Sequence, residues 1–291
     1  MMKKLIIHGG VFHADDALCV ALAKYEYPDV EIVRTFKIAE EDINDPDVVI
    51  CDIGGFYDPE KGLLDHHNFC PLIAGTEVKM SAIGMLINYM GIEVSDSWNS
   101  ILTTIQGLDN GMMVENISEF GQKVSRLVRF WNPTWDSEKS SDEAFNEVVQ
   151  FLTDNFVKPM MEESDPEAVA VDNKLNELSS LSEAAELRAE QIVKSALQKM
   201  EDKIVVLPIY APWQKVLVDS EAIFVVFPSV RGGYNLQCVP PVLNSFQKKV
   251  ELPDWNCSEE KPEGLTFEHA GRFIAAFQTE QQAINAAKSC F

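Results

Sequence analysis

The 291-residue chain lacks the patterns that mark several common protein classes. Its six cysteines are scattered and form no C-x-x-C pair, which argues against a disulfide framework and against a thiolate zinc site. The glycine fingerprints of P-loop and dinucleotide-binding proteins are also absent. We therefore expect a protein of a reducing compartment whose cysteines serve as small core residues.

Long hydrophobic runs are missing as well. No segment approaches the ~20 apolar residues of a membrane span. The apolar stretch behind Met1-Met2-Lys3-Lys4 is too short for the core of a signal peptide. The chain is 46% hydrophobic and 24% charged, as ordinary soluble proteins are. We expect a cytoplasmic protein with no membrane partner, and we leave a homodimer open as its oligomeric state.

Basic residues are scarce, with 24 Lys and Arg against 46 Asp and Glu, for a net charge of −22. Residues 136–190 alone carry 15 acidic and 4 basic side chains, a pattern that a solvated helical surface explains. A long polyanion would be repelled by such a protein. If the chain acts on nucleic acid, we expect short strands, strand ends or nucleotides rather than a wrapped duplex.

The order of predicted elements is typical of an α/β domain in the first half of the chain. Strands are predicted over residues 3–7, 31–34 and 47–52, and helices over residues 16–25, 81–90 and 97–108. Such alternation favours a mainly parallel sheet flanked by helices. We assign residues 1–140 to this domain and expect it to hold the catalytic site.

The second half is predicted to contain a smaller α+β lobe. Long acidic helices over residues 141–156 and 173–200 are separated by breaks at Lys158-Pro159 and Asp165-Pro166. Strands follow over residues 203–207, 222–227 and 234–239, and a last helix over residues 271–288. We expect residues 141–200 to be a helical connection and residues 201–291 to be a substrate-binding lobe.

The run Asp65-His66-His67 is the first candidate for chemistry. A buried carboxylate and imidazole must be hydrogen-bonded or metal-bound, and side by side they make a half-shell for a divalent transition metal. Taken alone, the triplet is more typical of a solvated loop than of a metal site.

Further hard oxygen and nitrogen donors stand at the ends of predicted elements. The candidate metal ligands are His8, His13, Asp15, Asp52, His66 and Asp109. A role as helix cap accounts for either Asp15 or Asp16, but not for both. A role in a turn accounts for Asp52 or for Asp109 if each is considered alone. Since the loops at the carboxyl ends of parallel strands form one crevice, the set favours two ions of the Mn²⁺ or Mg²⁺ type.

In order along the chain, these residues resemble the DHH phosphoesterase superfamily, and more narrowly its melanocyte-proliferating-gene branch. The resemblance rests on His8-Gly-Gly-Val-Phe-His13-Ala-Asp15-Asp16, Asp52-Ile-Gly-Gly, Asp65-His66-His67 and Leu108-Asp109-Asn110-Gly111. Later matches are Asn132-Pro133-Thr134-Trp135, Ala211-Pro212-Trp213, Gln237-Cys-Val-Pro240, Ser245-Phe246 and Glu268-His269-Ala270. Together they cover nearly the whole chain.

The resemblance implies a metal-dependent phosphodiesterase, and for this branch a 3′-to-5′ exonuclease that acts on RNA. It places His13, Asp15, Asp52, His66 and Asp109 at metal-binding positions. His67 then faces the substrate and, with Asp65, belongs to the catalytic set. A second histidine, His13, takes the place of the first acidic residue of the superfamily pattern. The resemblance therefore leaves open which of His8 and His13 binds metal more directly.

In the C-terminal lobe, Arg231, Gly232 and Gly233 are candidates for substrate binding. Glycine lets backbone N–H groups approach an anion, and an arginine can bind phosphate through two hydrogen bonds. A hairpin turn with a surface arginine accounts for the same pattern. His269, which precedes the predicted last helix, is a further candidate for the same cleft.

Three functions are therefore weighed. The first is a Mn²⁺-dependent, two-metal phosphodiesterase that shortens single-stranded RNA or oligonucleotides from the 3′ end. The second keeps the enzyme but changes its substrate to pyrophosphate or a small nucleotide, which the acidic composition favours. The third is a regulatory protein that binds metal without turnover.

Overall fold

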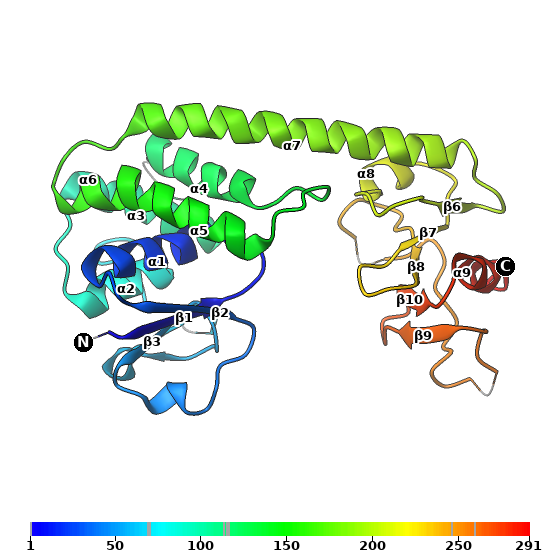
Figure 1. Cartoon of the computed structure of the whole chain (residues 1–291), viewed down its shortest axis with the longest axis horizontal. Helices are drawn as coiled ribbons and strands as arrows, with labels where there is room; N and C mark the ends of the chain where they lie inside the picture. The colour runs from blue at the N-terminus through cyan, green and yellow to red at the C-terminus, as the bar shows by residue number, and fades with distance from the viewer. Residues whose placement is uncertain (1, 69–70, 113, 115–116, 246, 259) are drawn as a thin grey trace. The chain divides into compact units, whose positions relative to one another are not determined.

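The computed structural model describes residues 2–68, 71–112, 114, 117–245, 247–258 and 260–291. Cys70, one of the six cysteines, and Phe246, of the motif Ser245-Phe246, lie outside these residues. The chain forms two compact units, Met1–Ser182 and Glu183–Phe291. The long helix α7 (Ala168–Leu197) begins in the first unit and ends in the second (Figure 1).

The first unit is built on a five-stranded sheet of order β2-β1-β3-β5-β4. Its strands are β1 (Lys4–His8), β2 (Glu31–Thr35), β3 (Val48–Cys51), β4 (Tyr57–Asp58) and β5 (Leu63–Leu64). β1 pairs in parallel with β2 and β3, β5 continues parallel to β3, and only β4 is antiparallel among these strands. The predicted, mainly parallel sheet is confirmed, and β1, β3 and β5 all end at the same edge.

Helices gather on one side of this sheet, as Figure 1 shows. They are α1 (Ala14–Glu26), α2 (Ala82–Met90), α3 (Asp96–Asp109), α4 (Glu119–Trp131) and α5 (Ser141–Leu152). Alternate strand residues such as Leu5, Ile7 and Val49 are buried under these helices. The residues between them, such as Ile6 and Ile50, pack in a smaller apolar cluster. This two-sided burial explains why the strands are continuously apolar.

Two features of the helical part differ from the prediction. The expected break at Lys158-Pro159 is absent, because a π-helical turn (Thr153–Val157) joins α5 to the short helix α6 (Lys158–Met161). Pro159 stands in the first turn of α6, where its missing N–H costs little. Helix α4 was not predicted, although Ser118 caps it through a hydrogen bond from the Gly121 N–H.

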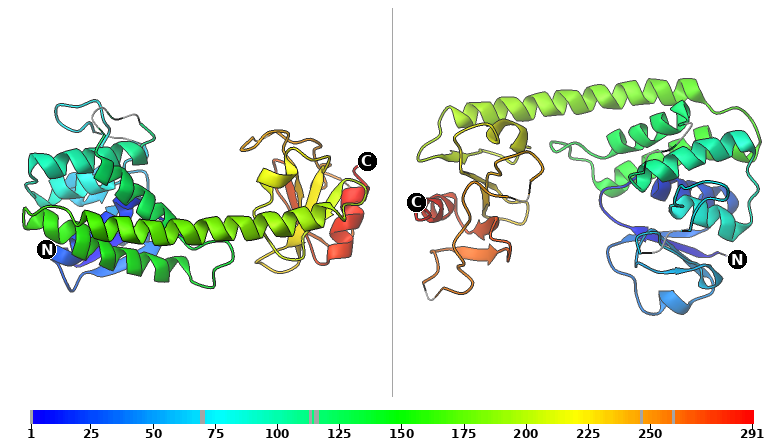
Figure 2. Two further views of the ribbon diagram at one scale, coloured as in Figure 1. Left: turned by 90° about the horizontal axis from the view of Figure 1, so that it is seen from above. Right: turned by 180° about the vertical axis from the view of Figure 1, so that it is seen from behind.

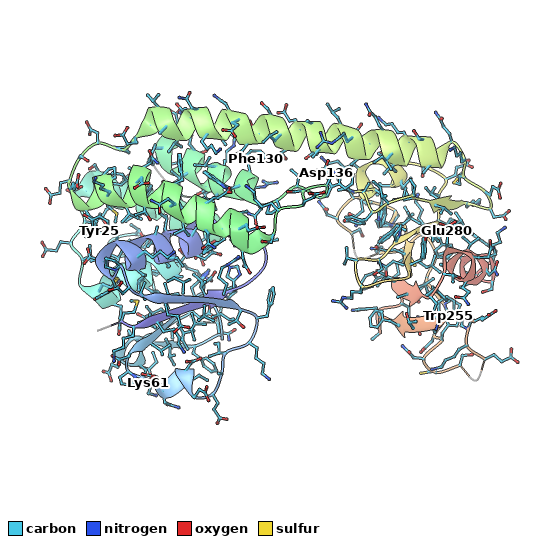
Figure 3. All side chains as sticks on the ribbon, in the orientation of Figure 1. Tyr25, Lys61, Phe130, Asp136, Trp255 and Glu280 are labelled. Atoms are coloured by element: carbon cyan, nitrogen blue, oxygen red, sulfur yellow. The ribbon has the colours of Figure 1, made fainter. Side chains whose placement is uncertain are left out.

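The second unit holds another five-stranded sheet, of order β6-β7-β8-β10-β9. Its strands are β6 (Ile204–Val206), β7 (Phe224–Pro228), β8 (Tyr234–Cys238), β9 (Leu265–Glu268) and β10 (Ile274–Phe277), with helices α8 (Gln214–Leu217) and α9 (Glu280–Lys288). Figure 2 shows α9 beside the strands. Buried Trp255, labelled in Figure 3, packs edge-on against Phe277 at 6.0 Å between ring centroids. The α+β class predicted for this part is confirmed.

The predicted last helix over residues 271–288 is wrong in its first half. Ile274–Phe277 is strand β10, which pairs with both β8 and β9. The helix begins only after Thr279, whose side chain accepts from the Gln282 N–H in a capping box. Among the described residues, no helix is long and apolar enough to cross a membrane.

Candidate metal centre

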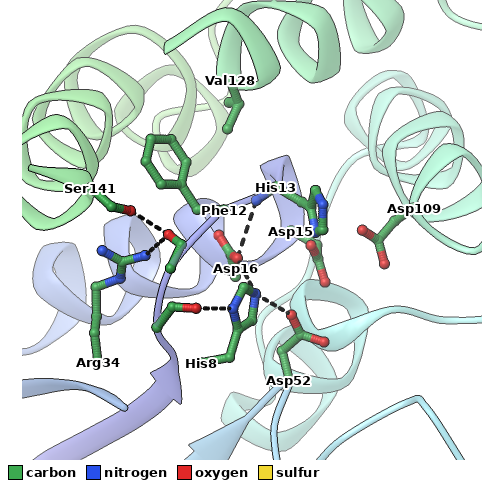
Figure 4. A network of polar contacts seen from close by, with 12 residues as sticks. His8, Phe12, His13, Asp15, Asp16, Arg34, Asp52, Asp109, Val128 and Ser141 are labelled. Atoms are coloured by element: carbon green, nitrogen blue, oxygen red, sulfur yellow. Dashed lines mark hydrogen bonds and ion pairs between the residues drawn. The ribbon is translucent and has the colours of Figure 1, made fainter. Parts of the chain in front are cut away.

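The end of β1 places His8 between two carboxylates (Figure 4). Its Nε2 lies 2.6 Å from Asp16 Oδ2 and 3.1 Å from Asp52 Oδ2. Burial lowers the pKa of His8, but the hydrogen bonds from its ring to Asp16 and Asp52 outweigh burial and raise that pKa to about 10. Without bound metal, His8 is therefore protonated and links the start of α1 to the end of β3.

The first turn of α1 contributes two buried carboxylates. Asp16 Oδ2 accepts a 3.1 Å hydrogen bond from the His13 N–H, so Asp16 caps the helix as expected and also holds His8. Both carboxylate oxygens of Asp15, and Oδ1 of Asp16, are buried without a hydrogen-bond partner among the described residues. Burying an anion in this way is costly unless a cation compensates it.

The carboxylate of Asp15 is repelled by the neighbouring carboxylates of Asp52 and Asp109. Burial, and then the charges of Asp52 and Asp109, raise the pKa of Asp15 well above its ordinary value. Burial also raises the pKa of Asp109, which ends α3. His13, Asp15 and Asp109 each offer a ligand atom within 4.8 Å of the others. A bound cation would relieve the repulsion that these raised pKa values report.

Asp52 follows β3 in a backbone conformation that non-glycine residues rarely adopt, with φ at 56°. Such local strain is typical of functional positions. Burial raises the pKa of Asp52, but hydrogen bonds from His66 and His8 outweigh it and lower that pKa to about 2. Asp52 is therefore ionised and stands between the two histidines.

His66 points its Nε2 at three carboxylates. The distances are 3.0 Å to Asp52 Oδ1, 3.2 Å to Asp109 Oδ2 and 3.9 Å to Asp15 Oδ2. On the other side of the ring, Nδ1 lies 3.2 Å from Asn110 Oδ1. Asn110 is itself fixed, because its Nδ2 donates to the backbone carbonyls of Gln106, Lys79 and Met80. This support orients the ring with Nε2 toward the carboxylates.

Asp65 and His67 form a separate pair at the rim. Buried Asp65 accepts from the Gly55 N–H through Oδ2 and from the His67 N–H through Oδ1. The same Oδ1 lies 2.6 Å from His67 Nδ1. The His67 side chain is 63% exposed, and its Nδ1 also lies 3.6 Å from Asp52 Oδ1. Asp65 thus positions His67 and is not one of the metal-facing carboxylates.

The loop between β1 and α1 is held by residues that the sequence analysis did not assign to the site. Asn132 brackets Phe12, because its side chain accepts from the Phe12 N–H and donates to the Phe12 carbonyl. Arg34 and Ser141 both donate to the carbonyl of Gly10 (Figure 4). These contacts fix the segment that carries His8 and His13. Only Asn132, in the motif Asn-Pro-Thr-Trp, gave a signal in the sequence.

The donor set fits divalent cations. The overlapping groups that can hold an ion are His8-His13-Asp16, Asp52-His66-His67, His13-Asp15-Asp109 and Asp15-Asp16-Asp52. All of these donors are carboxylate oxygens or imidazole nitrogens, which suit Mn²⁺ and related ions. The Asp15 oxygens have no hydrogen-bond partner among the described residues and so remain available to a bound cation. Every metal ligand predicted from the sequence lies in this cluster, together with Asp16.

The candidates in the second unit have a different environment. Arg231, Gly232 and Gly233 form the turn between β7 and β8, where the Gly232 N–H donates to the Ser229 carbonyl at 3.0 Å. His269 follows β9, and its Nδ1 accepts from the Gly271 N–H at 2.9 Å. The β8–β10 register puts Gly233 beside the end of β10 and His269 before its start. Within the unit, these residues lie at opposite ends of one strand, and their role in substrate binding stays a prediction.

This fold and site define an α/β protein whose clustered carboxylates and histidines form a candidate metal centre. The family model MYG1_exonuc, described as "Uncharacterised protein family (UPF0160)", matches residues 4–291, and the chain belongs to this family. The resemblance to the melanocyte-proliferating-gene branch is thereby confirmed. The name of the family agrees with the predicted class of enzyme, a metal-dependent hydrolase of phosphodiester bonds.

Relatives match along almost the whole chain. The chain is 25% identical to human "MYG1 exonuclease", with 97% of this chain and 84% of that protein covered. It is 24% identical to "MYG1 protein" of Dictyostelium discoideum, with 95% and 93% covered. Among solved structures, it is similar to "Crystal structure of exonuclease RecJ bound to manganese", at 12% identity and a TM-score of 0.45, with 99% of this chain and 88% of that chain covered.

Proposed function

We propose that this protein is a two-metal phosphodiesterase that removes nucleotides from the 3′ end of short single-stranded RNA or oligonucleotides. The buried, uncompensated carboxylates at the edge where β1, β3 and β5 end carry this proposal. The names of the relatives, several of which include "exonuclease", support nucleic acid as the substrate. The 3′-to-5′ direction and the choice of RNA rest on the family resemblance.

His13, Asp15, Asp52, His66 and Asp109 would hold the cations, and Asp16 with His8 would complete their surroundings. Bound divalent cations would polarise the phosphoryl group and make water nucleophilic near neutral pH. Asn110 keeps His66 Nε2 turned toward the carboxylates. Asp65 holds Nδ1 of the exposed His67 ring, which leaves Nε2 to donate a hydrogen bond to a phosphoryl oxygen or to protonate the leaving oxygen.

An exposed aromatic ring beside the centre favours a nucleobase-bearing substrate over pyrophosphate. Phe36 is 81% exposed and lies over the Gly9-Gly10 segment that follows His8. A Cβ on Gly10 would be 2.9 Å from the ring, so glycine permits this close approach. An exposed ring is a stacking platform for a base of a single strand. Pyrophosphate would make no use of it.

The test uses 5′-labelled single-stranded RNA with added Mn²⁺, and it follows phosphate release from pyrophosphate in the same tubes. Asp52→Asn is the sharpest variant, because asparagine tolerates the positive φ of 56° while the charge is lost. We expect activity to fall on the order of 1,000-fold in Asp52→Asn and in His66→Ala. Exposed Asp29→Asn is the matched control and should retain wild-type activity.

The proposal would be supported if the wild type shortens the labelled RNA from its 3′ end and neither Asp52→Asn nor His66→Ala does so. Shortening from the 5′ end would overturn the direction. Intact RNA with phosphate released from pyrophosphate would replace the substrate with a small phosphoanhydride. Metal binding without hydrolysis of either substrate would favour a regulatory protein that does not turn over.

A further inference from the structure

A cavity of about 330 Å³ opens beside the metal centre, within the first unit. His13 and Asp109 line it, and both also belong to the candidate metal centre. Its other walls come from the loop before α1, from the end of α3 and from α4. Any group bound there would be next to a phosphate held by the cations.

Part of the apolar lining of this cavity is exposed to solvent. Val11 is 68% exposed and Leu108 is 41% exposed, although each stands within two residues of a candidate metal ligand. Phe12 and Ile105 extend the apolar surface inward. Large hydrophobic side chains left open beside a charged centre are typical of a ligand-binding surface.

The polar lining has unused donors. Ser125 Oγ is buried without a hydrogen-bond partner among the described residues, and it faces the cavity from α4. One turn later on the same helix, Arg129 also lines the cavity, and its guanidinium forms no ion pair within the described part of the chain. Because buried polar groups are normally paired, the Ser125 hydroxyl indicates a polar ligand edge, and the exposed Arg129 side chain supplies a second donor beside it.

We propose that this cavity binds the terminal nucleoside of the substrate strand, a proposal that rests on the phosphodiesterase function above. A nucleobase has apolar faces, which would contact Val11 and Leu108, and a polar edge, which would accept from Arg129 and Ser125. The volume is at the lower end of ligand pockets, which run from ~300 to ~1,000 Å³, and so suits a single nucleoside. A pocket of this size beside the metals would select a strand end over an internal bond.

The test compares two substrates that release the same p-nitrophenolate when water attacks phosphorus. They are thymidine 5′-(p-nitrophenyl phosphate) and methyl p-nitrophenyl phosphate, which differ only in the nucleoside. The ratio of their kcat/KM values isolates the contribution of the nucleoside. We expect the wild-type ratio to be on the order of tenfold or more in favour of the thymidine ester.

Arg129→Ala and Leu108→Trp should each lower this ratio by about fivefold or more, the first by removing a donor and the second by filling the cavity. Arg126→Ala is the matched control, because it removes the same charge from another exposed position of α4 that does not line the cavity. The ratio in Arg126→Ala should equal that of the wild type. An unchanged ratio in Arg129→Ala and Leu108→Trp, or an equal drop in all three variants, would overturn the nucleoside site.

Binding is measured independently by calorimetric titration with thymidine 5′-monophosphate in the presence of Ca²⁺. If the wild type hydrolyses neither ester, the phosphodiesterase function fails, and this titration alone decides on the cavity. Weaker binding in Arg129→Ala than in Arg126→Ala would support the nucleoside site. No binding by the wild type, or equal binding by both variants, would contradict it.

Discussion

Two regions contain residue types that are associated with phosphate binding. One is the metal centre of the first unit, and the other is the turn Arg231-Gly232-Gly233 of the second unit. They differ in how their polar groups are satisfied. Around Asp15, buried carboxylate oxygens have no hydrogen-bond partner among the described residues. In the β7–β8 turn, the N–H groups of Arg231 and Gly232 already donate to Ser229. Unsatisfied groups indicate a missing ligand, whereas satisfied ones are what a stable turn requires.

The largest effect on stability is expected from Gly233→Ala. Gly233 has φ at 71°, and an added Cβ would lie 2.2 Å from the Phe277 carbonyl oxygen. We expect a loss of about 2–4 kcal/mol, the sum of backbone strain and overpacking. Gly232→Ala is the control, because nothing lies within 4 Å of its Cβ position, and it should cost about 1 kcal/mol. Chemical denaturation measures both, and equal losses would contradict the structural role assigned to Gly233.

Asn110→Ala should impair the metal centre without removing a ligand. Its side chain fixes His66 Nδ1, so its loss frees the ring to turn. Losing such a support lowers metal affinity or activity by about 10- to 100-fold. Exposed Asn146→Ala on α5 is the matched control. Mn²⁺ affinity is the readout, and an unchanged affinity in Asn110→Ala would show that the ring is held by other contacts.

Asp15→Asn should stabilise the protein in the absence of added metal. Since the folded state raises the pKa of Asp15, folding favours its protonated form, and stability falls as the pH rises above the ordinary carboxyl range. A neutral amide removes this cost, and we expect a gain of about 1–2 kcal/mol at pH 7. The gain should shrink toward pH 4. Thermal denaturation in EDTA at several pH values tests this, and a destabilised variant at pH 7 would contradict it.

The smallest effect is expected from Arg231→Ala. Arg231 is exposed in a turn that forms without its side chain. If it contacts substrate, KM for RNA should rise about two- to fivefold with little change in kcat, as for a phosphate contact in solvent. Exposed Arg126→Ala serves as the comparison. A rise that is equal in both variants would reduce the role of Arg231 to general positive charge.

The sequence indicated residues of the centre where the residue type and its position at the end of a predicted strand or helix both favoured metal binding. Of the five histidines, four lie at or beside the centre, and each stands next to a predicted strand or helix end. The mainly parallel sheet could be anticipated because parallel strands have continuous apolar runs. His66 and Asp109 meet only because the carboxyl end of β5 and the end of α3 converge, which spacing along the chain does not reveal.

The errors have physical causes as well. Ile274–Phe277 (Ile-Ala-Ala-Phe) suits a helix or a strand, and pairing with β8 and β9 decided in favour of the strand. Helix α4 was missed although Ser118 precedes an apolar pattern at Val124, Leu127 and Val128. Asn110 and Arg34 act on the site through hydrogen bonds that no local pattern encodes.

The most direct test of the central claim is a calorimetric Mn²⁺ titration of EDTA-treated protein, with Asp52→Asn and Asp29→Asn measured in parallel. We predict saturable binding by the wild type and by Asp29→Asn, with affinity in Asp52→Asn reduced on the order of 100-fold or more. Binding in Asp52→Asn equal to that of the wild type would contradict the claim that this cluster is a metal centre.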